Sequence, residues 1–263
     1  MGNVKLKYDG ERPVFEKEAD GLHGIFTRHK ARYKFIVEQL TANGSWGKVL
    51  DTGCGTGHGS HILAEAGCSV IGVDIAPDAI EYALNHRERD DIEFLVMNCE
   101  KLDFPEESFD GVASVEVLEH VPDYESYVKE ISRVLKKGGR FVLTTPNVDY
   151  PGAFGITTSH YHVKEFTYDD LMETLQPHFS KVEIYGESVS DPAVIKWEKD
   201  FNNVRGKLPG RFKLIMRRVM PQFLSSFIRR RLVGPEPKLA VEDVVYSPED
   251  ATLKMQFAVV CTK

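Results

Sequence analysis

The sequence predicts an α/β protein built on a doubly wound, seven-stranded and mainly parallel sheet, with a helical insertion late in the chain. From Lys48 onward, short apolar runs rich in β-branched residues alternate with segments of helical periodicity. A glycine-rich turn follows the first of these runs. Of the 263 residues, 42% are hydrophobic and 28% are charged, which excludes collagen-like, disordered and disulfide-stapled chains. Strands interleaved with helices at this spacing form a parallel sheet that is covered on both faces.

Seven apolar runs are the candidate strands: Lys48–Asp51, Ser69–Asp74, Ile92–Met97, Phe109–Val115, Arg140–Thr145, Lys181–Tyr185 and Leu253–Thr262. The segments between them favour helices. Pro77 stands at a first helical position, ahead of a helix that reaches His86. Tyr124–Lys136 has helical spacing and stops at a Lys-Lys-Gly-Gly sequence. Thr167, with Asp170 three residues later, is the predicted N-cap of a helix that ends near Leu175.

The alternation divides the chain into four parts. Residues 1–45, with an amphipathic stretch from Gly21 to Leu40, are expected to form a helical cover, and residues 46–186 form the core. Residues 187–250 are expected to be a basic helical insertion that acts as a lid, and residues 251–263 return to the core as its last strand. Lys196 to Lys238 carries a local charge of +9, although the whole chain carries −7.

The sequence predicts a cytoplasmic protein. The first residues have no apolar stretch of the kind a signal peptide needs. No apolar run approaches the roughly 20 residues that span a bilayer. The four cysteines are dispersed and form no Cys-x-x-Cys pair, which is typical of buried thiols in a reducing compartment.

The glycine turn is the most informative segment. The run Asp51-Thr52-Gly53-Cys54-Gly55-Thr56-Gly57-His58-Gly59 leaves a strand and enters a helix. Glycine allows close approach of a ligand to the backbone, and a helix N-terminus favours an anionic group. The spacing fits neither the dinucleotide fingerprint nor a P-loop. The turn alone therefore does not identify its ligand.

Three further features follow this turn in order: the strand end Val73-Asp74-Ile75, then Asn98, then the segment Phe104–Asp110. This ordered set resembles the class I S-adenosylmethionine-dependent methyltransferases over roughly residues 46–186. The resemblance implies a Rossmann-like methyltransferase fold and S-adenosyl-L-methionine as cofactor.

By that resemblance, Asp51 and the backbone at Gly53 and Gly55 hold the methionine end of the cofactor. Asp74 binds both ribose hydroxyls, and Ile75 lies against the adenine. Asn98 stands where the family usually has Asp, but an Asn carbonyl can also accept a hydrogen bond from the adenine amino group.

The acceptor half of the site is predicted after the fourth strand. Glu116, Glu119 and His120 are spaced so that one helical turn brings them to the same side. Together with His162 they resemble the set that binds a divalent cation in small-RNA 2′-O-methyltransferases. The resemblance implies Mg²⁺ or Mn²⁺ at an acceptor diol.

A second interpretation stays open, because Glu-His also occurs at this position in methyltransferases of this class that bind no metal. In that case His120 or His162 is the candidate general base. His58, His61 and His160 are interpreted as surface or loop residues.

A broader resemblance concerns the substrate. Glu11-Arg12-Pro13, the Glu-His motif, Thr145-Pro146-Asn147 and the segment from His162 to Thr167 occur together in bacterial saccharide and natural-product methyltransferases. Ubiquinone-biosynthesis O-methyltransferases share the central part. The resemblance implies methyl transfer to a hydroxyl of a small-molecule or saccharide acceptor. The alternatives are methylation at nitrogen or carbon, and a non-catalytic cofactor-binding protein.

The basic insertion has three interpretations. Arg217-Arg218 and Arg229-Arg230-Arg231 lie beside apolar stripes. A lid whose arginines bind an anionic acceptor is favoured, because guanidinium forks suit phosphate and carboxylate. The alternatives are a basic helix on an anionic membrane, and a face that is either simply solvated or associates with the acidic core of a second copy to form a homodimer. A nucleic-acid partner is not favoured, because the body of the protein is acidic.

Overall fold

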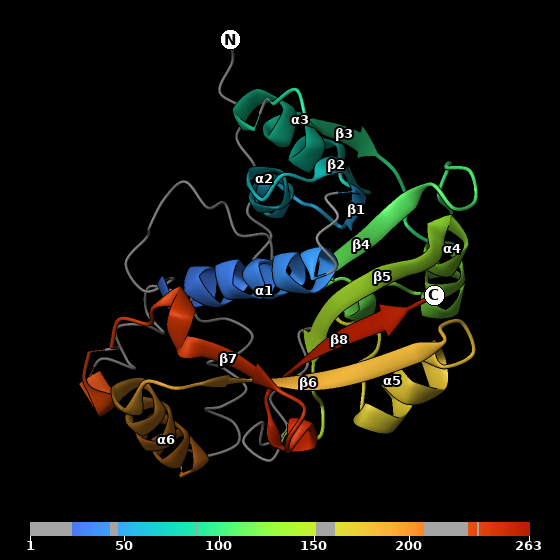
Figure 1. Ribbon diagram of the computed structural model, residues 1–263. Helices are drawn as coiled ribbons and strands as arrows, with labels where there is room; N and C mark the ends of the chain where they lie inside the picture. The colour runs from blue at the N-terminus through green and yellow to red at the C-terminus, as the bar shows by residue number, and fades with distance from the viewer. Residues whose placement is uncertain (1–22, 43–46, 88, 151–160, 208–230, 236) are drawn as a thin grey trace. The chain divides into compact units, whose positions relative to one another are not determined.

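The computed structural model describes residues 23–42, 47–87, 89–150, 161–207, 231–235 and 237–263. Within these ranges one mixed sheet runs in the order β3-β2-β1-β4-β5-β8-β6-β7 (Figure 1). Its strands are β1 (Lys48–Thr52), β2 (Ser69–Asp74), β3 (Ile92–Val96), β4 (Phe109–Val115), β5 (Leu135–Pro146), β6 (Lys181–Val189), β7 (Val244–Ser247) and β8 (Gln256–Thr262). The helices are α1 (His23–Thr41), α2 (His58–Glu65), α3 (Pro77–His86), α4 (Tyr124–Val134), α5 (Tyr168–Leu175) and α6 (Pro192–Gly206).

The first five strands pair in parallel, so their carboxyl ends meet at one edge of the sheet. β8 runs antiparallel between β5 and β6. Ligands of open α/β sheets bind at the edge where the strands end and the strand order reverses. Here the order reverses between β1 and β4, so a ligand site is expected at the segments that follow these two strands.

The predicted count of seven strands is wrong, because the sheet has an eighth strand, β7, within the described residues. Val244–Ser247 lies in the segment assigned to the insertion and pairs with β6. β6 also extends to Val189, four residues beyond the predicted end. A strand of four residues gives little periodicity to find in a sequence.

The boundary between α4 and β5 also differs from the prediction. α4 ends at Val134, and β5 already begins at Leu135. The register between β4 and β5 shifts after Leu135, so the lysines and glycines that were expected to follow a helix lie in an irregular part of the strand. Gly138 permits this through a φ of 74°. The last strand is shorter than predicted, because Ala251–Leu253 forms a 3₁₀ turn before β8.

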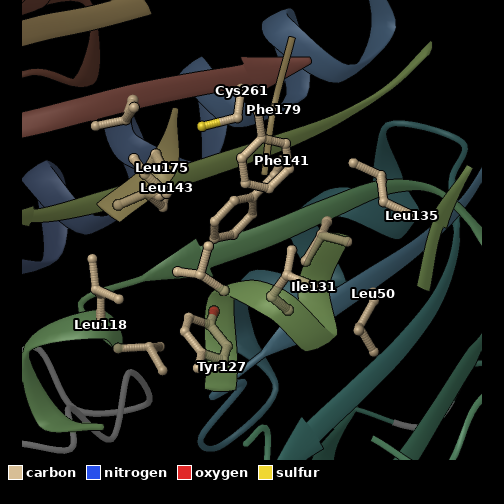
Figure 2. Close-up of a cluster of buried hydrophobic side chains, with 14 of the residues drawn as sticks. Leu50, Leu118, Tyr127, Ile131, Leu135, Phe141, Leu143, Leu175, Phe179 and Cys261 are labelled. Carbon is tan, nitrogen blue, oxygen red and sulfur yellow. The ribbon is translucent and has the colours of Figure 1, made fainter. Parts of the chain in front are cut away.

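A layer of hydrophobic side chains covers each face of the sheet. On one face, α4 and α5 cover a cluster that includes Tyr127, Ile131, Phe141 and Leu143, all fully buried (Figure 2). On the other face, the second half of α1 and α2 pack against alternate residues of the same strands. The predicted capping box of α5 is complete, since Thr167 and Asp170 exchange side-chain-to-backbone hydrogen bonds.

The described chain divides into two compact units. One comprises Arg32–Glu187 and Tyr246–Lys263 and contains most of the sheet. The other comprises the beginning of α1 and Ser188–Val245, which overlaps the expected insertion and includes α6. The arginine-rich stretch over 208–230 lies outside the described residues, so its lid role stays a prediction. Among the helices that are described, none has the length and hydropathy needed to cross a bilayer.

Candidate functional site

The glycine turn after β1 has an open backbone. Gly53, Gly55 and Gly57 adopt φ angles of 63°, 54° and 77°, a region that side chains disfavour. A Cβ atom on Gly53 would lie 2.5 Å from a methyl group of Val117. A Cβ atom on Gly55 would meet nothing within 4 Å. Gly53 is therefore required by packing, whereas the backbone at Gly55 lies beside open space that a ligand can approach.

Asp74 lies beside this turn, at the end of β2. Its carboxylate accepts hydrogen bonds from the backbone N–H of Gly55 and of Ala76, both at 2.9 Å. These contacts fix the carboxylate before any ligand arrives. The next side chain, Ile75, is 65% exposed. An exposed isoleucine beside a fixed carboxylate is an arrangement that can hold a ribose and the flat face of a base.

Asp51 is fully buried at the other side of the turn. Its carboxylate accepts hydrogen bonds from Tyr33 Oη at 3.0 Å and from Ser60 Oγ at 2.6 Å. Burial raises the pKa of Asp51 to about 7, the nearby charge of Asp74 adds to this, and the two hydrogen bonds oppose it.

Tyr33 and Ser60 are hydrogen-bond partners of Asp51 that the sequence prediction missed. Tyr33 comes from α1, and its ring fills the space over Gly59, where a Cβ atom would lie 1.8 Å from the ring. Gly59 was the only signal of this contact in the sequence. A glycine in the first turn of a helix indicates that another group packs closely against the backbone. Nothing in the sequence identifies Tyr33 as the partner.

Asn98 lies just beyond β3 and is exposed. Its side-chain oxygen accepts from the backbone N–H of Glu100, and its amide nitrogen donates to the Glu100 carboxylate, both at 2.9 Å. The other Glu100 oxygen accepts from the backbone N–H of Asp123, the N-cap of α4, at 2.8 Å. Asn98 is thus oriented by its own loop and keeps capacity for a second acceptor contact.

After β4, the short 3₁₀ helix Leu118–His120 carries a buried acid. Glu119 is fully buried, and its Oε2 accepts a hydrogen bond from Thr145 Oγ1 at 3.0 Å. Its Oε1 is buried without a hydrogen-bond partner within the described residues. Burial, and secondarily the charge of Glu116, raise the pKa of Glu119 well above its ordinary value. Such an orphaned oxygen has the chemistry expected of a ligand for a cation.

The loop that carries His162 is tied to this turn. The backbone N–H groups of Val163 and Lys164 donate to the Glu119 carbonyl at 2.8 and 3.3 Å. The rings of His120 and His162 lie edge to face, with centroids 4.9 Å apart. One donor atom from each of Glu119, His120 and His162 lies within 4.8 Å of the others. The three residues could therefore hold a divalent cation.

Glu116, the fourth predicted ligand, is directed elsewhere. It has a φ of 56° and does not belong to the group of three in the described part of the chain. Its carboxylate accepts from Thr144 Oγ1 at 3.2 Å and from the side-chain amide of Gln256, and lies 3.5 Å from the Arg32 guanidinium. These three partners make Glu116 a link between β4, β5, β8 and α1.

Arg32, Glu187 and Tyr246 form a second polar cluster, which the sequence analysis did not predict. The Nε of Arg32 donates to Glu187 Oε2 at 2.9 Å, and the Glu187 side chain is completely buried. Tyr246 Oη donates to the same oxygen at 3.4 Å. Although burial opposes it, the charges of Glu187 and Glu116 raise the pKa of Arg32 above its ordinary value. The guanidinium thus neutralises a buried carboxylate next to the segment that follows β4.

Of the three histidines interpreted as surface or loop residues, His58 and His61 belong to α2, where His61 forms an ion pair with Glu65 at 3.3 Å. His160 lies outside the described residues.

A known family profile matches part of the chain. Residues 50–143 match the sequence profile of the methyltransferase domain family. This match spans the glycine turn, Asp74, Asn98 and the Glu116–His120 segment.

Two relatives are similar to parts of the chain. A Mycobacterium tuberculosis protein named "Probable S-adenosylmethionine-dependent methyltransferase" is 29% identical over 171 residues, 65% of this chain and 60% of that protein. The ubiquinone biosynthesis O-methyltransferase of Coxiella burnetii is 36% identical over 121 residues, 45% of this chain and 51% of the enzyme. In both, the match covers less than two thirds of the relative's length.

Solved structures share the fold. The YcgJ protein from Bacillus subtilis aligns with a TM-score of 0.59 at 19% identity, covering 89% of this chain and 99% of that one. A SAM-dependent methyltransferase from Archaeoglobus fulgidus aligns with a TM-score of 0.57 at 16% identity, covering 92% and 94%. The architecture is the Rossmann-like methyltransferase fold, here with a mostly parallel sheet of eight strands.

Proposed function

We propose that this protein is an S-adenosyl-L-methionine-dependent methyltransferase that methylates a hydroxyl group. The observation that carries the proposal is the meeting of two half-sites at one edge of the sheet. Asp74 ends β2 and Gly55 follows β1, while Glu119 and His120 follow β4. Since these three strands are parallel and adjacent, a cofactor held by the first pair would have its methyl group on the side of the second pair.

In this proposal, Asp74 binds the ribose hydroxyls, Ile75 lies against the adenine, and Asn98 accepts from the adenine amino group. Asp51 and the backbone of Gly53 and Gly55 hold the methionine end. This assignment uses groups that are already oriented, since Asp74 and Asp51 each accept two hydrogen bonds.

The acceptor oxygen attacks the methyl carbon, the carbon–sulfur bond breaks, and S-adenosylhomocysteine leaves. The hydroxyl must also lose its proton, for which an imidazole of His120 or His162 is the acceptor. Glu119, His120 and His162 would hold Mg²⁺ or Mn²⁺, which lowers the pKa of a bound hydroxyl. A neutral amine attacks without the metal or base that a hydroxyl needs, which favours oxygen over nitrogen. The basic stretch from Lys196 to Lys238 favours a small-molecule or saccharide acceptor that carries an anionic group.

The test measures transfer of label from S-adenosylmethionine to fractionated small molecules and glycans, with EDTA and after Mg²⁺ is restored. Label in a hydroxyl-bearing product supports the proposal, and loss with EDTA supports the cation. A product methylated at nitrogen or carbon contradicts the choice of oxygen. Cofactor binding without any product favours the non-catalytic alternative.

Asp74→Ala is expected to weaken cofactor binding by about 1–3 kcal/mol, or roughly 5- to 150-fold, because a charge-assisted hydrogen bond to the ribose is lost. Calorimetric titration with S-adenosylhomocysteine measures this change. Glu93→Ala, at an exposed position of the neighbouring β3, is the matched control and should bind normally. Unchanged affinity in Asp74→Ala would remove this carboxylate from the site.

Cofactor binding is expected to release a proton. Because burial raises the pKa of Asp51 to about 7, this carboxyl is partly protonated near neutrality, and a cationic ligand favours its charged form. Affinity for S-adenosylmethionine should therefore rise between about pH 6 and pH 8. Binding heats in two buffers with different ionisation enthalpies report the proton, and Asp51→Asn should remove the difference. Equal heats for the unaltered protein in both buffers would contradict this prediction.

The raised pKa of Asp51 also makes the stability of the ligand-free protein depend on pH in one direction. Between about pH 4 and pH 7 the unfolded chain has lost the Asp51 proton while the folded protein retains it. The contribution of Asp51 to the free energy of unfolding therefore falls as the pH rises through this window.

A further inference from the structure

Glu165 is a buried acid within the loop that carries His162. Its side chain is 5% exposed, and its Oε1 lies 3.0 Å from Nδ1 of His162, whose side chain is 11% exposed. The adjacent Phe166 is fully buried and bridges to Asn147, which anchors the end of the loop. Glu165 and His162 are therefore held together by the fold.

The contact determines which nitrogen of His162 carries hydrogen. A carboxylate only accepts hydrogen bonds, so a neutral His162 ring that makes this contact with a carboxylate carries its hydrogen on Nδ1. In a neutral imidazole the lone pair then resides on Nε2. Leaving a carboxylate buried without this donor would be costly, so the contact constrains both partners.

His120 has the same arrangement with a different acceptor. Its Nδ1 lies 3.2 Å from the backbone carbonyl oxygen of Tyr161, and a carbonyl also only accepts. One loop, residues 161–165, thus supplies an acceptor to Nδ1 of each histidine. With the hydrogen on Nδ1, the lone pair of a neutral His162 ring lies on Nε2, where it can serve the group formed with Glu119 and His120.

We propose that Glu165 is a positioning residue that fixes His162 in its Nδ1–H tautomer and so makes Nε2 the electron-pair donor of the acceptor site. This inference rests on the proposed function for the use of Nε2. The tautomer itself is a property of the protein without cofactor, metal or acceptor. It can therefore be tested separately from catalysis.

The test records long-range ¹H–¹⁵N correlations of the histidine rings at about pH 9, well above the ordinary imidazole pKa of about 6.5. The His162 signals are assigned by their loss in His162→Gln. The unaltered protein should show a protonated Nδ1 and an unprotonated Nε2 at His162. The opposite pattern would overturn the proposal without any Glu165 variant.

Two substitutions separate positioning from packing. Glu165→Met removes the acceptor at similar volume and should let His162 populate the Nε2–H tautomer. Glu165→Gln retains an acceptor oxygen and should restore the original pattern. Glu65→Ala is the matched control, because it removes an exposed carboxylate from the His61 pair on α2. An unchanged His162 tautomer in folded Glu165→Met would overturn the proposal.

Metal affinity is the second readout, with Mn²⁺ as the probe and its electron paramagnetic resonance signal as the measure. Glu165→Met should bind Mn²⁺ about 10- to 100-fold more weakly, as expected for loss of a group that orients a ligand. Glu65→Ala should bind as the unaltered protein does. If the unaltered protein binds no Mn²⁺, the cation in the proposed function fails, while the tautomer measurement still decides the role of Glu165.

Discussion

Glu119→Gln should abolish metal-dependent methyl transfer, whereas Glu116→Gln should retain most of it. The two glutamates lie three residues apart in one motif, but only Glu119 shares the compact group with His120 and His162. Its Oε1 has no hydrogen-bond partner among the described residues, while the Glu116 carboxylate has three protein partners. We expect Mn²⁺ affinity to fall by at least about 100-fold in Glu119→Gln. Even the loss of a residue that only hydrogen-bonds to a metal ligand typically lowers metal affinity by about 10- to 100-fold.

Both variants carry the same chemical change, so each is the control for the other. Mn²⁺ titration and labelled methyl transfer should be measured on both, with circular dichroism to check folding. Glu116→Gln weakens an ion pair with Arg32 whose acidic side chain is 29% exposed, and such a pair contributes about 0–1 kcal/mol. An equal loss of metal binding in both variants would contradict the three-residue set and favour four ligands.

Arg32→Met is expected to lower the free energy of unfolding by about 3–5 kcal/mol, because it breaks a buried ion pair by removing one partner. The Glu187 side chain is completely buried, and its Oε2 accepts from Arg32 Nε at 2.9 Å and from Tyr246 Oη at 3.4 Å. Urea denaturation measures the loss. Such a change is a large fraction of the 5–15 kcal/mol that stabilises a typical domain.

The double variant Arg32→Met with Glu187→Gln distinguishes the buried charge from lost packing. Once the carboxylate is replaced by a neutral amide, most of the lost stability should return. If the double variant is as unstable as Arg32→Met alone, the contribution of Arg32 comes from the packing of its side chain. If Arg32→Met is as stable as the unaltered protein, the ion pair makes no net contribution.

Local signals in the sequence were sufficient for the central sheet and for the position of Asp74 beside the glycine turn. The first four strands are short apolar runs, helix starts separate β1 from β2 and β2 from β3, and β1 is followed by glycines whose spacing is informative. Asp74 was predictable because it ends a strand at a fixed distance after that turn. These features depend on neighbours in the sequence, so periodicity and turn chemistry reveal them.

The remaining features depend on contacts between distant segments. The motif spacing placed Glu116 with Glu119, but a positive φ at Glu116 and the approach of Arg32 and Gln256 direct it away. Tyr33 reaches Asp51 from a helix that precedes the core strands. Such partners are set by how α1, β5 and β8 pack, and one sequence does not contain that information.

The position of β8 has a consequence for synthesis of the chain. β5 is bordered by β4 on one side and by residues 256–262 on the other, and these residues are made last among the strands. Until they leave the ribosome, the apolar residues Phe141–Leu143 lie on an unpaired strand edge, a surface prone to pairing with other chains. β6 also cannot join the sheet before β8 has been made, because β6 pairs with the sheet through β8. The nascent protein therefore completes its sheet late, and substitutions that weaken β8 should reduce the yield of folded protein before they alter any binding step.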